Sequence, residues 1–459
     1  SFVEKCIMET TMYWFSDARH LDVFNLVLER VSQRFSLVME ILGDCSKEVR
    51  RFSRFFRNTR VKISQMMHTF SLSLEECCKG KHILLIQDSS ELSFGFEPFQ
   101  SNLGPVGNGT ERGFFIHPVL AVDADTLYCE GLGHVEIYKR GDVLLSQERP
   151  FEDKLTYRWL NSVVQARKCC AGAAQHTVIA DRVADIYEGL SGYQKQDLGF
   201  IIRADVNRRL YELEEKLEER IASWPVKHVY DVDLPRTKKR SAHTARLELR
   251  SGTIQIARPN RPVLRKSEHP PFLEFNVVEV HELQATVVGK EEPIHWILFT
   301  SLPVQTTELA MFVVRCYIHR WTIEQLFRTM KSKGLKVEDN MAEDFHSLSK
   351  IAVLGLMAAV KVIQMVAIRD GNLSIHANCT FSDQQIKILE KINPTLEGNT
   401  EKQKNPYPLK SMAYAAWVIA RLGGWKGSPK ERKPGPIRFL RGFQKFENFC
   451  QAASIFWDA

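Results

Sequence analysis

Two short apolar runs that each end on an aspartate constrain the fold of this chain more than any other sequence feature. The first, residues 82–87, is followed by Asp88, and the second, residues 177–180, is followed by Asp181. Short continuous apolar runs are typical of buried strands, and a helical stretch over 155–170 separates these two. The pattern predicts an α/β fold in which both aspartates stand at the carboxyl ends of strands in one sheet.

Neighbouring aspartates at strand ends are candidate metal ligands. Two carboxylates held side by side repel each other unless cations lie between them. Such oxygen ligands select Mg²⁺ or Mn²⁺ over zinc. The alternative is that Asp88 and Asp181 only cap the backbone, which is the more common role of an aspartate at a strand end. The ten cysteines include no CxxC pair, so we expect reduced, buried thiols and not a zinc site.

The remaining patterns divide the 459 residues into regions. Residues 1–75 read as helices, residues 205–300 alternate like an antiparallel β insertion, and helices return from 306 onward. The most apolar window, 351–368, contains Lys361 and Gln364, so we expect a core helix and not a membrane span.

Two basic segments suit a polyanionic partner, which the net charge of +7 permits without requiring it. Residues 50–60 interleave five arginines, among them Arg54 and Arg57, with three phenylalanines, as expected of a surface that neutralises phosphates. An amphipathic helix whose arginine face is merely solvated explains this pattern equally well. The second segment is the run 236–240, with Lys238, Lys239 and Arg240.

A third acidic position lies on the helix predicted over 317–331. At about 100° per residue, four polar side chains of this helix fall within roughly 60° of one another. They are Tyr317, Arg320, Glu324 and Lys331. Glu324 could complete a metal site, while Arg320 and Lys331 suit phosphate oxygens. A solvated, salt-bridged helix face remains the alternative on this spacing alone.

The spacing Y-x2-R-x3-E-x6-K resembles the signature of a bacterial insertion-sequence family of DDE transposases. Other segments resemble motifs of that family in the same order along the chain, from about residue 50 to the end. They are residues 86–90, 103–104 with 112–117, 181–186, 249–252 and 419–424.

This resemblance implies the architecture of the chain. Residues 76–370 would form an RNase H-like catalytic core with a β-strand insertion at about 205–300. Residues 1–75 would be a helical DNA-binding region, and residues 371–459 a helical dimerisation region. The implied partners are duplex DNA, at the transposon ends and the target, and a second copy of the chain, with no membrane and no nucleotide cofactor. The implied location is the bacterial cytoplasm, at the nucleoid when the protein is on DNA.

The resemblance also implies the chemistry. Asp88, Asp181 and Glu324 would hold two Mg²⁺ ions, for which Mn²⁺ can substitute, and the enzyme would nick DNA at the transposon end. The freed 3′-hydroxyl would form a hairpin, which is reopened before the 3′ end joins target DNA. Trp296 would receive a flipped base by stacking, although core packing explains a tryptophan there equally simply.

DNA contacts follow from the same resemblance. Tyr317, Arg320 and Lys331 would hold the terminal phosphates, and Arg203 would add another contact. A catalytically silent DNA-binding protein or inhibitor is the alternative, and a nuclease that never joins strands is a third possibility. The presence of all three acids favours the active enzyme. The chain has no G-x4-G-K-[ST] motif, so an ATP-driven remodeller is not expected.

Overall fold

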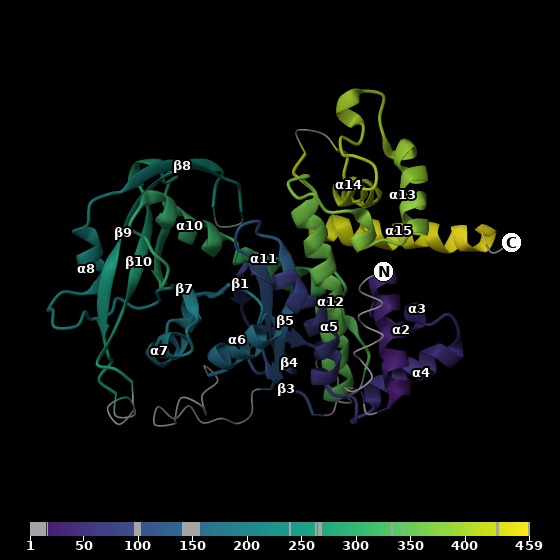
Figure 1. The fold of residues 1–459 in the computed structure, drawn as a ribbon, viewed down its shortest axis with the longest axis horizontal. Coiled ribbons are helices and arrows are strands. Elements are labelled where there is room, and N and C mark those ends of the chain that lie inside the picture. Colours follow the sequence, from purple (N-terminus) through teal and green to yellow (C-terminus); the bar gives the residue numbers. More distant parts are fainter. Residues whose placement is uncertain are drawn as a thin grey trace.

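The computed structural model of the chain is built around one mixed sheet. It describes residues 15, 17–95, 102–139, 157–237, 240–261, 264, 269–331, 334–342, 344–427 and 431–457. The strands are β1 (His82–Gln87), β2 (Ser90–Ser93), β3 (Gly104–Val106), β4 (Glu111–Asp123), β5 (Cys129–Tyr138), β6 (Gln175–Ala180), β7 (Gly199–Arg203), β8 (His228–Leu234), β9 (His243–Ala257), β10 (Phe272–Glu282) and β11 (His295–Thr300). They form an 11-stranded sheet in the order β2-β4-β1-β6-β7-β11-β10-β9-β8, with β3 and β5 also paired to β4 (Figure 1).

Five strands form the catalytic-core arrangement predicted from the sequence. In the order β5-β4-β1-β6-β7, strands β1, β6 and β7 are parallel, whereas β4 runs antiparallel to both β1 and β5. The parallel strands are joined by helical crossovers, α6 (Tyr157–Cys169) before β6 and α7 (Tyr187–Lys195) between β6 and β7. The prediction of an RNase H-like α/β core is confirmed.

The β insertion extends this core on its β7 side. Strands β8, β9 and β10 pair antiparallel with one another, and β11 returns the chain to pair antiparallel with β7. Buried residues recur at every second position over much of β9, which is typical of a strand covered on one face. The short helix α8 (Leu217–Ala222) packs against β9. The predicted β insertion is confirmed.

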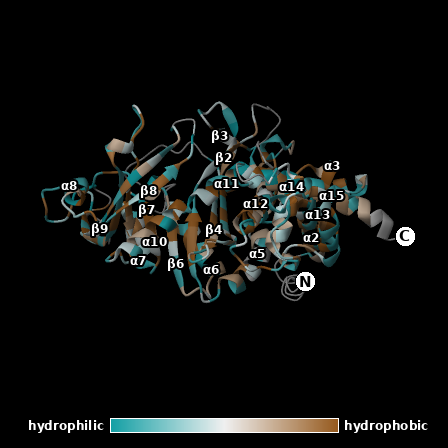
Figure 2. Ribbon diagram, turned by 90° about the horizontal axis from the view of Figure 1, so that it is seen from above, coloured by the Kyte–Doolittle hydropathy of each residue, from teal (hydrophilic) through white to brown (hydrophobic). Residues whose placement is uncertain are grey.

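Helices flank the sheet at both ends of the chain. The N-terminal helices are α2 (Ala18–Arg34), α3 (Met39–Leu42), α4 (Ser46–Arg57) and α5 (Ile63–Cys78). The later helices are α10 (Thr307–Ile318), α11 (Trp321–Met330), α12 (Phe345–Ile368), α13 (Asp383–Leu396), α14 (Met412–Leu422) and α15 (Pro436–Trp457). Figure 2 shows hydrophobic residues gathered along the strands and the helices packed beside them.

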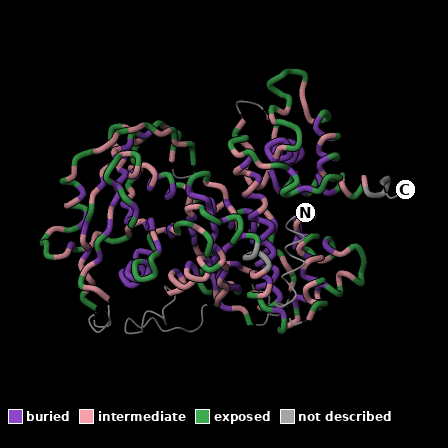
Figure 3. The backbone as a smooth tube through the Cα atoms, in the orientation of Figure 1, coloured by how far each residue is buried: buried purple, intermediate pink, exposed green. Residues whose placement is uncertain are grey.

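Helix α12 joins the helical regions to the sheet. It contacts α2, α4, α14, α15 and β5, and Figure 3 shows it among the buried parts of the chain. By length and composition it could cross a membrane, but 78% of its most apolar window is buried inside the protein. This burial is typical of a core helix, as predicted.

The prediction of a single helix over 317–331 is wrong, because the helix is interrupted. Helix α10 ends at Ile318, α11 begins at Trp321, and Arg320 lies at the junction. There the amides of Arg320, Thr322 and Ile323 each donate to the carbonyl three residues earlier, which tightens the turn. Lys331 ends α11 in an extended conformation.

Candidate active site

Strand register brings Asp88 and Asp181 to the same edge of the sheet. In the parallel pair β1–β6, Ile86 is opposite Ile179, and each aspartate follows two residues later. Adjacent strands lie about 4.8 Å apart, so the two acids follow their strands as neighbours. Burial, and next the nearby charge of Asp181, raise the pKa of Asp88 to about 6. The repulsion expected between paired carboxylates is therefore present.

Each aspartate also accepts a local backbone hydrogen bond. The Ser89 amide donates to Asp88 Oδ1 at 2.8 Å, and the Val183 amide donates to Asp181 Oδ1 at 2.9 Å. Asp181 thereby caps the short 3-10 helix Arg182–Ala184. The capping role considered from the sequence is therefore observed for Asp181. In each aspartate only Oδ1 accepts these local bonds, and Oδ2 does not take part in them.

Arg320 joins the third acid to the first. Its Nη1 lies 3.2 Å from Asp88 Oδ2, and its Nη2 lies 2.5 Å from Glu324 Oε1. No group of three histidine, cysteine, aspartate or glutamate residues with metal-binding geometry occurs within the described parts of the chain. In this arrangement the Arg320 guanidinium supplies the positive charge between the two carboxylates, and a metal ion would have to replace it there.

An aromatic and basic wall adjoins the acids. The Trp296 and Tyr317 rings pack edge to face, with centroids 5.4 Å apart. The Tyr317 hydroxyl interacts with Arg203 and Arg320, and burial raises the pKa of this tyrosine. Arg203 Nη2 also donates to the His295 carbonyl at 3.1 Å. Trp296 and Arg203, each predicted apart from the helix face of Tyr317 and Arg320, therefore lie together with it beside the acids.

Several other predicted contacts lie apart from this cluster. Among the described side chains, no hydrogen bond or ion pair joins Lys331 to the acids. Arg240, in the loop before β9, lies near Glu291 of the loop before β11. Lys238 and Lys239 are outside the described residues. Arg54 and Arg57 are exposed on α4.

Two features of the site were missed by sequence reasoning. Trp321, directly after Arg320, is 58% exposed, and only its position inside the signature motif hinted at it. His117, on β4, is fully buried and contacts Ser89 beside Asp88. His117 ends the segment 112–117 that resembles a family motif, but its contact with Ser89, 28 residues away, was not predicted.

A buried ion pair supports the loop that carries Asp181. Arg208 lies 2.5 Å from Asp185, whose side chain is completely buried. The Asp205 amide also donates to Asp185 Oδ2 at 2.8 Å. These bonds tie the segment after β6 to the segment after β7, so Asp185 supports the loop that carries Asp181.

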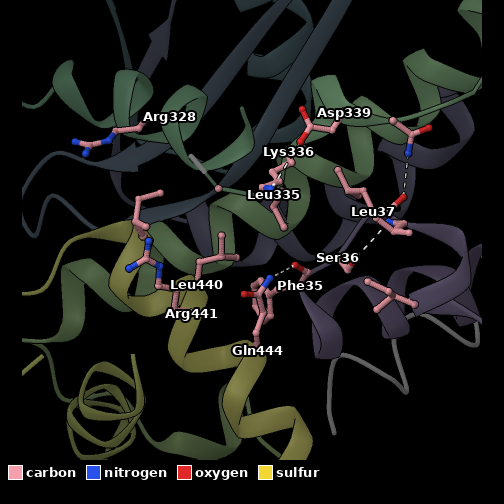
Figure 4. Close-up of a pocket in the computed structure, with 15 residues that line it drawn as sticks. Phe35, Ser36, Leu37, Arg328, Leu335, Lys336, Asp339, Leu440, Arg441 and Gln444 are labelled. Atoms are coloured by element: carbon pink, nitrogen blue, oxygen red, sulfur yellow. Dashed lines mark hydrogen bonds and ion pairs between the residues drawn. The ribbon is translucent and has the colours of Figure 1, made fainter. Parts of the chain in front are cut away.

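A basic cleft of about 750 Å³ lies at the other end of α11. Figure 4 shows its walls, formed by the α2–α3 loop, the chain around α11 and helix α15. Arg328, Lys336 and Arg441 line it together with a single acid, Asp339, which is 3.8 Å from Lys336. Because Arg328 follows Glu324 by four residues, the cleft begins about 6 Å along the helix axis from the third acid.

Part of the chain that contains this site matches a known family model. Residues 153–361 match the family model of the transposase DDE domain. The matched segment contains Asp181 and Glu324, covers less than half of the chain, and begins after Asp88. The match supports a DDE transposase, and the DDE domain implies dependence on divalent metal ions.

The fold was also compared with solved structures. The chain is similar, over 94% of its length and 76% of the other chain, to a cryo-EM structure of the piggyBac transposase synaptic complex with hairpin DNA. The TM-score is 0.35 and the identity 12%.

Proposed function

We propose that this chain is a cut-and-paste DNA transposase. It nicks DNA at the ends of its transposon, forms and reopens a hairpin, and joins the 3′ ends to target DNA. The observation that carries the proposal is the arrangement of Asp88 and Asp181 at register-matched strand ends, with Glu324 linked to Asp88 through Arg320. This cluster overlaps the segment that matches the transposase DDE domain.

The chemistry of the acids fits divalent ions. Asp88, Asp181 and Glu324 offer only oxygen donors, which Mg²⁺ and Mn²⁺ prefer. Burial, and next the charge of Asp181, raise the pKa of Asp88, and a bound cation would offset both effects. These three residues would hold two Mg²⁺ ions, and Mn²⁺ would substitute. Bound ions would supply an activated water and neutralise the leaving 3′ oxygen.

The aromatic and basic wall suits the DNA end. Trp296 is half-buried against Tyr317, so its position is fixed while part of its ring is accessible. A fixed aromatic ring stabilises a stacked base by about 1–3 kcal/mol. Arg203 and Arg320, which both interact with the Tyr317 hydroxyl, would supply charge for the neighbouring phosphates.

Longer DNA would follow the cleft at the end of α11. The cleft offers three cations from separate segments against one acid, a balance that favours a polyanion. Lys331 ends α11, between Arg328 and Lys336 along the chain, and would bind a phosphate near the cleft. The exposed arginines of α4, among them Arg54 and Arg57, and Arg240 with Lys238 and Lys239 would bind further phosphates.

The assembled form is a homodimer on paired transposon ends in the bacterial cytoplasm, with the C-terminal helices of residues 371–459 as the dimerisation region. Sedimentation of the full chain with end DNA should give two chains for two ends. A complex containing one chain for each unpaired end would contradict this part of the proposal.

A cleavage assay tests the function. A labelled duplex with the element's own end would be incubated with Mg²⁺ and the wild type, Glu324→Ala, Trp296→Ala or Trp296→Phe. We expect nicks and then hairpins from the wild type, no product from Glu324→Ala, and nicks without hairpins from Trp296→Ala. Trp296→Phe keeps an aromatic ring and should restore hairpins.

Exposed Glu75 on α5 provides the matched control, because Glu75→Ala should cut like the wild type. Binding of the end without any cutting, even with Mn²⁺, would show a catalytically silent DNA-binding protein. Nicks without hairpins from the wild type would instead show a nuclease that never joins strands.

A further inference from the structure

A buried polar network lies directly behind Asp88. His117 lies on β4 where the strand paired with β4 changes from β1 to β2. On one side of it Val119 pairs with Gln87 of β1, and on the other Ile116 pairs with Ser90 of β2. The side chain of His117 is therefore opposite the turn that carries Asp88. It is fully buried, as is Gln87.

The hydrogen bonds of this network fix the protonation of His117. Gln87 Nε2 donates to the Tyr193 hydroxyl at 3.2 Å, so Gln87 Oε1 is left to accept from His117 Nε2 at 2.9 Å. His117 Nδ1 then carries the lone pair and accepts the Ser89 hydroxyl at 2.7 Å. Burial lowers the pKa of His117 to about 3, which keeps the ring neutral and able to accept.

Ser89 connects this network to the acid. Its hydroxyl is held by His117, while its backbone amide donates to Asp88 Oδ1 at 2.8 Å. The Trp159 ring packs edge to face against the His117 imidazole, with centroids 4.8 Å apart, and limits its movement. The orientation of one carboxylate oxygen of Asp88 thus depends on a ring that itself has fixed partners.

We propose that His117 is a positioning residue for Asp88. Through Ser89 it holds the Asp88 carboxylate in the orientation needed to share a divalent cation with its neighbours. His117 itself touches neither the cation nor DNA. The inference rests on the proposed function, because it assumes that Asp88 binds a metal ion. Residues that orient ligands in this way typically change metal affinity about 10- to 100-fold when they are mutated.

Two substitutions at one position separate positioning from packing. His117→Asn keeps an acceptor near the place of Nδ1 and loses the bond to Gln87, whereas His117→Gln keeps a group near the place of Nε2 and loses the bond to Ser89. Each removes one buried hydrogen bond, so both should lower the unfolding temperature similarly. Binding of Mn²⁺ to the full chain, measured by electron paramagnetic resonance of the free ion, needs no cleavage.

We expect His117→Asn to bind Mn²⁺ within about threefold of the wild type, and His117→Gln to bind about tenfold or more weakly. Ser89→Ala should match His117→Gln, and the double variant Ser89→Ala/His117→Gln should lose no more than either alone, because both remove one connection. Equal loss from the two histidine variants, or unchanged Mn²⁺ affinity in Ser89→Ala, would overturn the positioning role. A wild type that binds no Mn²⁺ would overturn the proposed metal site itself, and this inference with it.

Discussion

His117 shows how one buried residue can make stability depend on pH. In the unfolded chain its pKa is the ordinary 6.5, whereas burial lowers it to about 3 in the folded chain. Below pH 6.5 the unfolded chain therefore binds a proton at this position that the folded chain does not bind. The resulting loss of stability is small above pH 6.5, grows as the pH falls, and approaches about 5 kcal/mol below pH 3.

This difference predicts a measurable effect at mild acidity. Between pH 7.5 and pH 5, His117 should cost the wild type about 2 kcal/mol of unfolding free energy. His117→Asn, which cannot titrate, should lose that much less over the same interval, whatever its stability at pH 7.5. Urea unfolding at the two pH values measures both losses. Equal losses in the two proteins would show that His117 takes up a proton in the folded state.

At the scale of elements, helix α4 has one face buried in the core and an opposite face of exposed arginines. Phe52, Phe55 and Phe56 are buried in the core, whereas Arg54 and Arg57 are exposed. The helix is amphipathic, as the sequence predicted, and its burial alone does not distinguish a DNA-binding arginine face from a solvated one.

Substitutions on the two faces should therefore have opposite signatures. Arg54→Ala with Arg57→Ala should leave the unfolding free energy nearly unchanged and lower the slope of log affinity for DNA against log salt by about 1.8. Phe52→Ala should instead cost about 3–5 kcal/mol of stability, because its side chain is fully buried. DNA titrations between 50 and 200 mM salt (about the range over which such contacts are measured) give the slope. An unchanged slope would show that the arginine face does not contact DNA and is only solvated.

At the scale of the whole molecule, distant parts of the chain meet at the basic cleft. The Phe35 and Phe443 rings stack with centroids 4.3 Å apart, and Gln444 donates to the Phe35 carbonyl at 3.0 Å. These contacts hold α15 against the α2–α3 loop and so bring Arg441 near Arg328 and Lys336 in one cleft (Figure 4).

The cleft predicts a second set of DNA contacts. Arg328→Ala with Arg441→Ala should reduce the salt slope of DNA affinity by about 1.8 if each side chain contacts one phosphate. Lys387→Ala with Lys402→Ala removes the same charge from exposed positions outside the cleft and provides the control. Equal effects of the two pairs would show that only overall charge matters and would exclude the cleft as a binding site.

Much of the fold was predictable because it depends on local patterns. The apolar runs that end on Asp88 and Asp181 are strands β1 and β6, and the alternating stretch of residues 205–300 contains β8 to β10. The spacing of apolar residues within a segment indicates which of its faces is buried, and this spacing can be read without knowing the rest of the fold. The fold class therefore followed from the sequence, together with a family resemblance that supplied the topology.

The contacts that shape the candidate site were decided only by the tertiary structure. Arg320 and Asp88 are separated by 232 residues, and His117 and Ser89 by 28. No local pattern predicts such pairs, because they depend on strand register and on the tight turn that places Arg320 between α10 and α11. The sequence by itself determined which residues could carry charge and metal. The tertiary structure decided their partners, because a hydrogen bond or an ion pair depends on distances that only packing sets.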